Sequence, residues 1–240
     1  MKRIILFAVF ALAASMSPAA RGETSKAAAA NVQTLPADAP FRDEILAFAE
    51  QDRESPPPKC PVLFVGSSSI RLWRTLEQDM APMHVLNRGF GGSTIAQSNL
   101  YFARIVAPYR PRAIVFYAGE NDLDSGEAPA AVAADFRKFM AKKRAKLGGT
   151  PVFFISAKPS KLRFSQFARQ TNLNRTIRTL AARSSDLTFV DVVPSMMAGS
   201  KPRDLYVDDG LHMTSEGYAI WSRLVREALA RKKIGERRCR

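Results

Sequence analysis

The sequence pairs a carboxylate with a histidine near its C-terminal end, in the segment DGLH at 209–212. Histidine is rare in this chain, which contains only His84 and His212. A serine hydrolase needs a base that titrates near neutrality and a carboxylate that orients it, and this segment places both within one short turn. The spacing therefore predicts that His212 is a general base and that Asp209 orients it.

A run of three serines supplies the candidate nucleophiles. Ser67, Ser68 and Ser69 follow the apolar segment PVLFV at 61–65 and precede the helix-like segment IRLWRTL at 70–76. A serine at a strand-to-helix turn can present its hydroxyl and its backbone N–H at the carboxyl end of a sheet. Turn or cap roles are the alternative, because serine-rich turns commonly precede helices.

Four separated segments resemble, in order and spacing, the four blocks of the SGNH (GDSL-type) hydrolases. They are VGSSSIRLW at 65–73, NRGFGGST at 87–94, GEND at 119–122 and DGLH at 209–212. The likeness runs roughly from Cys60 to the C-terminal helix. It implies that Ser68 is the nucleophile and that its N–H, Gly92 and Asn121 form an oxyanion hole. It also implies that His212 is the base, that Asp209 orients it, and that no cofactor is needed.

The first block departs from the usual pattern of the family at one position. Ser67 stands where these hydrolases usually have Asp before the nucleophile. Counting from Gly66 to Trp73 favours Ser68 over its two neighbours, and Ser69 is then expected to cap the next helix. The glycine-flanked nucleophile of the α/β-hydrolases is excluded, because Ile70 stands where their second glycine would be.

Other residue types near these blocks have simpler interpretations. His84 begins an apolar strand and is expected to pack or cap there. Asp208 is expected to be a loop carboxylate, since the Asp-x-x-His spacing favours Asp209. Asp122 and Asp124 could suggest a metal loop, but no His or Cys cluster accompanies them in the sequence, so no metal is expected. The glycines of the second block and the Asn-Asp pair of the third could also serve as turns.

Apolar runs alternate with amphipathic stretches, which predicts an α/β fold with a parallel sheet covered on both faces. We expect five strands, at 61–66, 84–89, 112–118, 151–157 and 187–193. We expect helices at 39–53, 70–80, 95–108, 128–147, 165–184 and 215–233. In such a sheet the strand-to-helix turns share one edge, so the first three blocks should meet there. The resemblance makes this a three-layer, flavodoxin-like α/β/α sandwich.

The N-terminal segment has the features of a bacterial-type secretory signal at 1–20. Lys2 and Arg3 precede an apolar run at 4–14, and small residues follow. An uncleaved membrane anchor is the alternative, although the run is short for spanning a bilayer. Residues 21–37 are predicted to be a linker and 38–240 the hydrolase domain. We therefore expect an exported, periplasmic or secreted protein whose mature chain has no transmembrane segment.

The chain is basic, with 36 Lys and Arg against 22 Asp and Glu and a net charge of +14. This charge should draw an exported protein to anionic surfaces such as phospholipid headgroups or acidic envelope polymers. Nucleic acid is not expected as a partner, because the export signal and the dispersal of charge over helix faces argue against it. The two cysteines, Cys60 and Cys239, are predicted to form a disulfide in an oxidising compartment.

These features together predict an exported serine esterase that acts as a monomer through an acyl-enzyme. The chain lacks a recognisable lid or long insertion, which favours short acyl esters, including acetyl groups on a glycan. The alternatives are a lysophospholipase or thioesterase acting on envelope lipid, a glycan O-acyltransferase with the same triad, and a catalytically dead module that binds glycan or lipid.

Overall fold

The computed structural model of the protein describes residues 35–236. The predicted signal segment at 1–20, most of the predicted linker at 21–37 and Cys239 lie outside these residues. The chain divides into two units, Met1–Ala37 and Asp38–Arg240, and the fold described below is that of the second unit.

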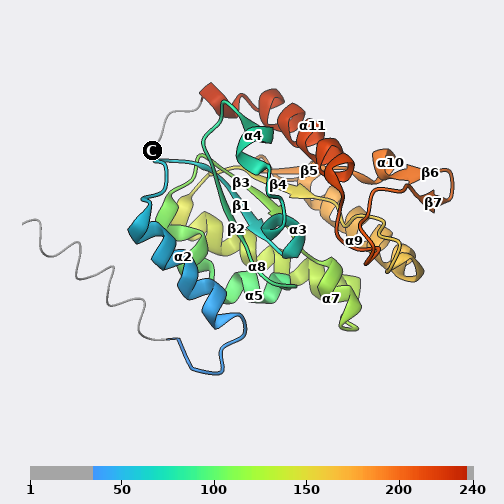
Figure 1. Ribbon diagram of the computed structural model, residues 1–240, viewed down its shortest axis with the longest axis horizontal. Coiled ribbons are helices and arrows are strands. Elements are labelled where there is room, and N and C mark those ends of the chain that lie inside the picture. The colour runs from blue at the N-terminus through green and yellow to red at the C-terminus, as the bar shows by residue number, and fades with distance from the viewer. Residues whose placement is uncertain (1–34, 237–240) are drawn as a thin grey trace, which may run out of the picture. The chain divides into compact units, whose positions relative to one another are not determined.

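The centre of the fold is a parallel sheet of five strands in the order β2-β1-β3-β4-β5 (Figure 1). The strands are β1 (Val62–Gly66), β2 (Val85–Gly89), β3 (Ala113–Tyr117), β4 (Val152–Ile155) and β5 (Leu187–Val190). In the register, Val62 lies opposite Val85 on one side and Ala113 on the other. The predicted α/β class with five parallel strands is confirmed, although three of the strands end earlier than expected.

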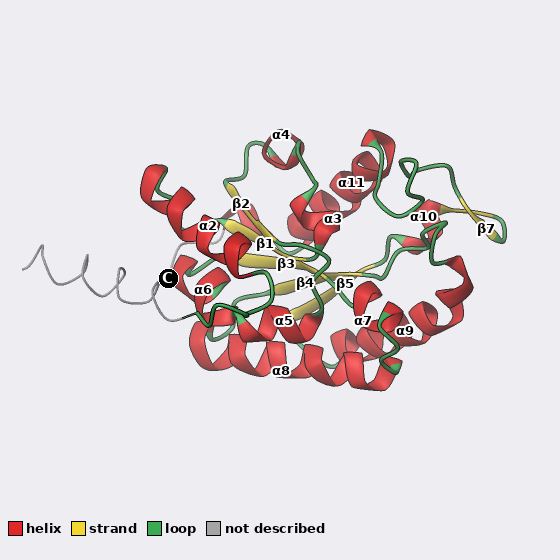
Figure 2. Ribbon diagram, turned by 60° about the horizontal axis from the view of Figure 1, so that its bottom comes forward, coloured by secondary structure: helices red, strands yellow, loops and turns green. Residues whose placement is uncertain are grey.

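Helices cover both faces of the sheet, as Figures 1 and 2 show. One face carries α3 (Ser68–Arg71), α4 (Leu76–Met80) and α11 (Ser215–Arg231), and the other carries α5 (Ile95–Leu100), α8 (Pro129–Leu147) and α9 (Phe167–Ala182). The remaining elements are α2 (Arg42–Glu54), α6 (Phe102–Ile105), η2 (Ala107–Tyr109), α7 (Glu120–Asp124), η3 (Phe164–Gln166), α10 (Val193–Met196), a hairpin of β6 (Met197–Ala198) and β7 (Lys201–Pro202), and η4 (Ile234–Glu236).

Two apolar layers form because successive side chains of a strand point to opposite faces. On one face Phe64 and Tyr117 belong to a core cluster with α11, where the rings of Tyr117 and Trp221 are 4.6 Å apart. On the other face Phe116 packs against Phe139 of α8 at 4.5 Å between ring centroids. The three central strands are therefore buried along their whole length, and the two outer strands β2 and β5 are partly exposed.

The prediction of one helix at 70–80 is wrong, because the chain forms two short helices there, α3 and α4. Trp73 lies between them, stacks on Tyr218 of α11 with centroids 5.4 Å apart, and donates from Nε1 to Asp79 Oδ2 at 2.5 Å. Burying this indole against α11 interrupts the helix. The helix predicted at 95–108 is likewise divided into α5, α6 and η2, with Pro108 in the last of them.

Within residues 35–236, no helix is both long enough and apolar enough to cross a membrane.

Candidate active site

The carboxyl end of β1 makes an unusually close turn, which only glycine can accommodate. Gly66 has a φ of 140°, and a Cβ at this position would lie 1.8 Å from the carbonyl oxygen of Tyr117. The next residue, Ser67, donates its N–H to that same carbonyl at 3.0 Å. The chain then turns directly into α3, so the serine run stands at the edge of the sheet.

The three serines have different surroundings. Ser67 precedes α3 as its N-cap residue and accepts at its carbonyl the N–H groups of Ile70 and Arg71. Ser69, expected to be the cap, instead lies inside α3, and its carbonyl accepts the hydroxyl of Tyr218 at 3.0 Å. Ser68 is the serine whose Oγ meets a ring nitrogen of a histidine. This contact distinguishes it from its neighbours.

Ser68, His212 and Asp209 form one connected chain of polar atoms. Ser68 Oγ lies 2.8 Å from His212 Nε2, and His212 Nδ1 lies 2.5 Å from Asp209 Oδ2. These are the distances at which a histidine can take a proton from a hydroxyl while a carboxylate holds its other nitrogen. Asp209, and not the adjacent Asp208, makes the contact with the ring.

A tight loop before α11 presents His212 to the serine. Val207 donates its N–H to the His212 carbonyl at 2.9 Å, and Gly210 turns the chain with a φ of 65°. After the loop, α11 returns across the sheet and carries Tyr218, whose hydroxyl binds Ser69. The same helix thus fixes the histidine loop and the backbone beside Ser68.

The Asp209 carboxylate remains ionised because backbone groups and the imidazole bind it. Burial by itself would raise the pKa of Asp209, but hydrogen bonds from the N–H groups of His212 and Leu211, together with the His212 ring, outweigh it and lower the pKa. The side chain of Asp209 is 44% exposed and that of His212 is 24% exposed. The aspartate and the histidine therefore face solvent, whereas Ser68 is buried at 8% exposure.

Donor groups from the second and third blocks lie next to each other, and Ser93 of the second block donates from its hydroxyl to the carbonyl of Gly66 at 3.2 Å, two residues before Ser68. Gly92 lies against the amide of Asn121, since a Cβ on Gly92 would be 3.8 Å from Asn121 Nδ2. The same Nδ2 donates to the carbonyl of Ser93 at 3.1 Å. Ile95, the first residue of α5, donates its N–H to Asp122 Oδ1 at 2.9 Å. The loop that carries Gly92 and the turn that carries Asn121 are therefore joined at two points.

Beneath this turn lies a buried ionic network that the sequence analysis missed. Glu120 Oε2 is 2.6 Å from Lys158 Nζ and accepts the hydroxyl of Tyr117 at 2.6 Å, while Oε1 accepts the hydroxyl of Ser160. Desolvation would raise the pKa of Glu120, but Lys158 and the hydroxyl donors lower it overall. The sequence feature that could have indicated this network is Lys158, a lysine that directly follows the apolar run predicted as the fourth strand.

A second missed residue is Arg163, from the loop after β4. Its Nη1 donates to Asn121 Oδ1 at 2.8 Å, and its Nη2 lies 2.8 Å from Asp124 Oδ2. Asp124 also accepts from Gln166 at 2.6 Å. The carboxylates next to Asn121 therefore bind protein donors, and among residues 35–236 no cluster of three or more His, Cys, Asp or Glu side chains is arranged to hold a metal ion.

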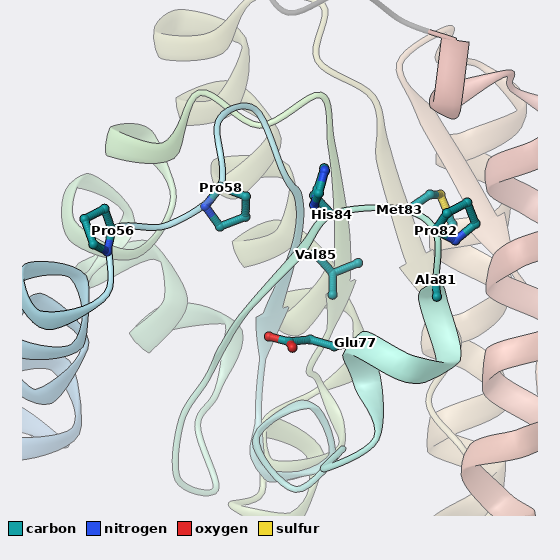
Figure 3. A pocket seen from close by; sticks show the side chains of 8 residues that line it. All are labelled: Pro56, Pro58, Glu77, Ala81, Pro82, Met83, His84 and Val85. Atoms are coloured by element: carbon teal, nitrogen blue, oxygen red, sulfur yellow. The ribbon is translucent and has the colours of Figure 1, made fainter.

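His84 lies at the amino ends of the strands, whereas Ser68 lies at their carboxyl ends. It immediately precedes β2, accepts the N–H of Val62 at its carbonyl, and lines a pocket of about 470 Å³ (Figure 3). The pocket is formed by Pro56, Pro58, Glu77, Ala81, Pro82, Met83, His84 and Val85. Because the amino ends of the strands are at this edge, the pocket is separate from the serine, histidine and aspartate.

Comparisons with known proteins identify the family and support the fold. A family model described as the GDSL-like lipase/acylhydrolase family matches residues 64–220. A GDSL-like lipase from Bacteroides thetaiotaomicron is 22% identical, with a TM-score of 0.67, and the alignment covers 78% of this chain and 98% of that one. A carbohydrate esterase family 3 protein from Talaromyces cellulolyticus is 15% identical (TM-score 0.59, 74% and 99% covered).

An acetyl xylan esterase is also similar, at 18% identity and a TM-score of 0.58, with 70% of this chain and 99% of that chain covered. A comparison with curated proteins found no match. At these levels of identity the solved structures support the fold alone. The family model spans all four blocks and indicates the class of reaction, acyl-ester hydrolysis.

Proposed function

Since the chain belongs to the GDSL-like lipase/acylhydrolase family, whose members are ester hydrolases, we propose that it is an exported serine esterase that uses Ser68, His212 and Asp209. The observation that carries this proposal is the continuous contact from Ser68 Oγ through both ring nitrogens of His212 to Asp209. No other histidine is available for the role among the described residues, because His84 lies at the far edge of the sheet.

The proposed reaction has two acyl-transfer steps. His212 Nε2 takes the proton of Ser68 as Oγ attacks the ester carbonyl, and Asp209 stabilises the resulting imidazolium. The carbonyl oxygen becomes an oxyanion that accepts hydrogen bonds from the N–H groups of Ser68 and Gly92 and from the amide of Asn121. His212 returns the proton to the leaving alcohol, which leaves an acyl-serine. Water, deprotonated by the same base, then releases the acid.

Short acyl groups are the substrates that this site suits best. The side chains of Asp209 and His212 are 44% and 24% exposed, while Ser68 is 8% exposed, so the site meets solvent on the side of the histidine and the aspartate. Each buried methylene of an acyl chain contributes about 0.8 kcal/mol, and only when it is buried. Two of the similar structures are a carbohydrate esterase and an acetyl xylan esterase, which supports acetyl groups on a glycan as the ester.

The proposal includes export of a basic protein, whose net charge is +14 for the full sequence and +12 without Lys2 and Arg3 of the predicted signal. The predicted signal at 1–20 would deliver the protein to the cell envelope or the medium, where glycans and lipids carry acyl esters. The positive charge would favour anionic carriers at low ionic strength, with that preference weakening as salt screens it.

Hydrolysis of aryl esters of increasing acyl length, run alongside acetylated polysaccharide and lysophospholipid, tests the proposal. We expect kcat/KM to peak between acetyl and butyryl and to fall by octanoyl. Ser68→Ala should abolish turnover without unfolding the protein, while Ser67→Ala and Ser69→Ala keep measurable activity. A profile that climbs steadily to palmitoyl would favour a lipid hydrolase, and near wild-type activity in Ser68→Ala would refute the mechanism.

A further inference from the structure

Arg163 joins two side chains of α7. It comes from the loop after β4, 42 residues along the chain from Asn121, and its side chain is 13% exposed. One terminal nitrogen donates to Asn121 Oδ1 and the other pairs with Asp124 Oδ2, both at 2.8 Å. The guanidinium is thus held by a carboxylate of the same helix that carries the proposed oxyanion-hole amide.

This contact determines which way the Asn121 amide faces. A guanidinium has donors and no acceptor, so the atom facing Arg163 must be the amide oxygen. The opposite end of the amide meets the Ser93 carbonyl, which accepts a hydrogen bond from Nδ2 at 3.1 Å. A flipped amide would place its NH₂ against the guanidinium and its oxygen against a carbonyl. The two contacts therefore fix Nδ2 next to Gly92, with one of its N–H groups bound to Ser93 and the second left to bind an oxyanion.

We propose that Arg163 is a positioning residue for the oxyanion hole and acts through Asn121: it holds the N–H that does not bind Ser93 toward the developing oxyanion and polarises it. This inference rests on the proposed function. Hydrogen bonds in series strengthen one another, so a cation on the amide oxygen makes the amide N–H groups better donors. Preorganised donors of this kind contribute most when they need not reorient during the reaction.

A double-mutant cycle between Arg163 and Asn121 tests whether the arginine acts through the amide. With an activated aryl acetate as substrate, we expect Arg163→Met to lower kcat by about 10- to 100-fold, with KM changing less than about threefold. In an Asn121→Ala background the same substitution should change kcat by less than about twofold, because the group through which it acts is gone. An equal loss in both backgrounds would overturn the inference.

Two further measurements separate positioning from a structural role. Arg169, which donates to the carbonyl of Glu127 at 2.7 Å, is the matched control, and Arg169→Met should leave kcat near that of the wild type. Guanidinium ion added at concentrations too low to unfold the protein should restore part of the rate of Arg163→Ala and none of the rate of Asn121→Ala. If Arg163→Met does not fold, Arg163→Lys replaces it in the cycle, with a smaller loss expected.

A readout that needs no turnover keeps this inference distinct from the proposed function. The NMR order parameter of the Asn121 side-chain amide should fall in Arg163→Met and remain unchanged in Arg169→Met. An inactive wild-type protein would refute the esterase proposal, whereas an unchanged order parameter, or additive losses in an active enzyme, would refute the role of Arg163 alone.

Discussion

Asp209 binds His212 at two places with its two oxygens. Oδ1 accepts the backbone N–H of His212 at 2.8 Å, and Oδ2 lies 2.5 Å from the ring nitrogen Nδ1. The carboxylate therefore sets the path of the loop and the orientation of the ring together. Residues 209–212 therefore orient the His212 ring through contacts of their own, and the rest of the fold places this ring next to Ser68.

Asp209→Asn should separate these two functions. The amide oxygen can still accept the backbone N–H, so the loop and the melting temperature should be preserved, but its NH₂ cannot accept from Nδ1. The imidazole then favours the wrong tautomer, and we expect kcat to fall by about 10³- to 10⁴-fold. Asp208→Asn is the matched control and should keep nearly full activity in the same ester assay. A mild effect of Asp209→Asn would contradict the assignment.

An alanine at Gly92 should lower activity without affecting folding, whereas an alanine at Gly66 should prevent folding. At Gly92 the nearest atom to an added Cβ is Asn121 Nδ2 at 3.8 Å, so Gly92→Ala should fold normally. The methyl group would stand beside the proposed oxyanion position, and kcat should fall by at least about tenfold. Gly66→Ala would clash with the Tyr117 carbonyl and should unfold the protein. Thermal melts and ester hydrolysis distinguish the two, and full activity in Gly92→Ala would count against the oxyanion hole.

Lys158→Met should destabilise the fold because it leaves Glu120 buried without its cation. Lys158 is fully buried and the Glu120 side chain is 4% exposed. Breaking a buried ion pair from one side typically costs about 3–5 kcal/mol, so denaturant unfolding should show a loss of that order. Adding Glu120→Gln to Lys158→Met should recover part of the loss. Stability equal to that of the wild type in the single variant would mean that the pair does not hold the turn.

Asp122 should make stability depend on pH between about 4 and 6. Burial raises the pKa of Asp122 from its ordinary value of 3.8 to about 6, with the Ile95 N–H opposing the shift. The folded state therefore binds this proton more tightly than the unfolded state. Its contribution is fully present below the unfolded pKa and is lost as pH rises through the folded pKa.

The difference between wild-type protein and Asp122→Asn isolates this contribution. Over this window the free energy of unfolding of the wild type should fall by about 2–3 kcal/mol relative to the variant, since each pKa unit corresponds to about 1.4 kcal/mol. Urea unfolding at pH 4 and pH 7 measures it, with Asp124→Asn as a control at a carboxylate paired with Arg163. Parallel pH curves for wild type and Asp122→Asn would contradict the shift.

The proposed disulfide joins Cys60 to Cys239. Cys239 lies outside the described residues. Arg112 donates from Nε to the carbonyl of Cys60 at 2.8 Å and from Nη1 to that of Gly235 at 3.4 Å, so the end of η4 lies near Cys60. Non-reducing peptide mapping of exported protein should recover the linked peptides. Replacing both cysteines with serine should cost about 2–5 kcal/mol. Alkylation of both thiols without reductant would refute the bridge.

The sequence by itself determined that the chain forms a five-stranded parallel sheet and that the first three blocks meet at the carboxyl ends of its strands. Strand and helix periods are local properties, and every parallel strand followed by a turn delivers that turn to the same edge. The pairing of Asp209 with His212 was also a local property, because the two residues are three positions apart and their contact is made within one loop.

Tertiary structure decided what depends on contacts between distant segments. Ser68 meets His212 across 144 residues, and it is this contact that marks Ser68, rather than Ser67 or Ser69, as the candidate nucleophile. The interruption of the predicted helix at Trp73 follows from packing against α11, which no local pattern encodes. Lys158 and Arg163 resemble ordinary loop cations in the sequence. They support the Asn121 turn because the loop after β4 folds over α7, which only the assembled sheet brings about.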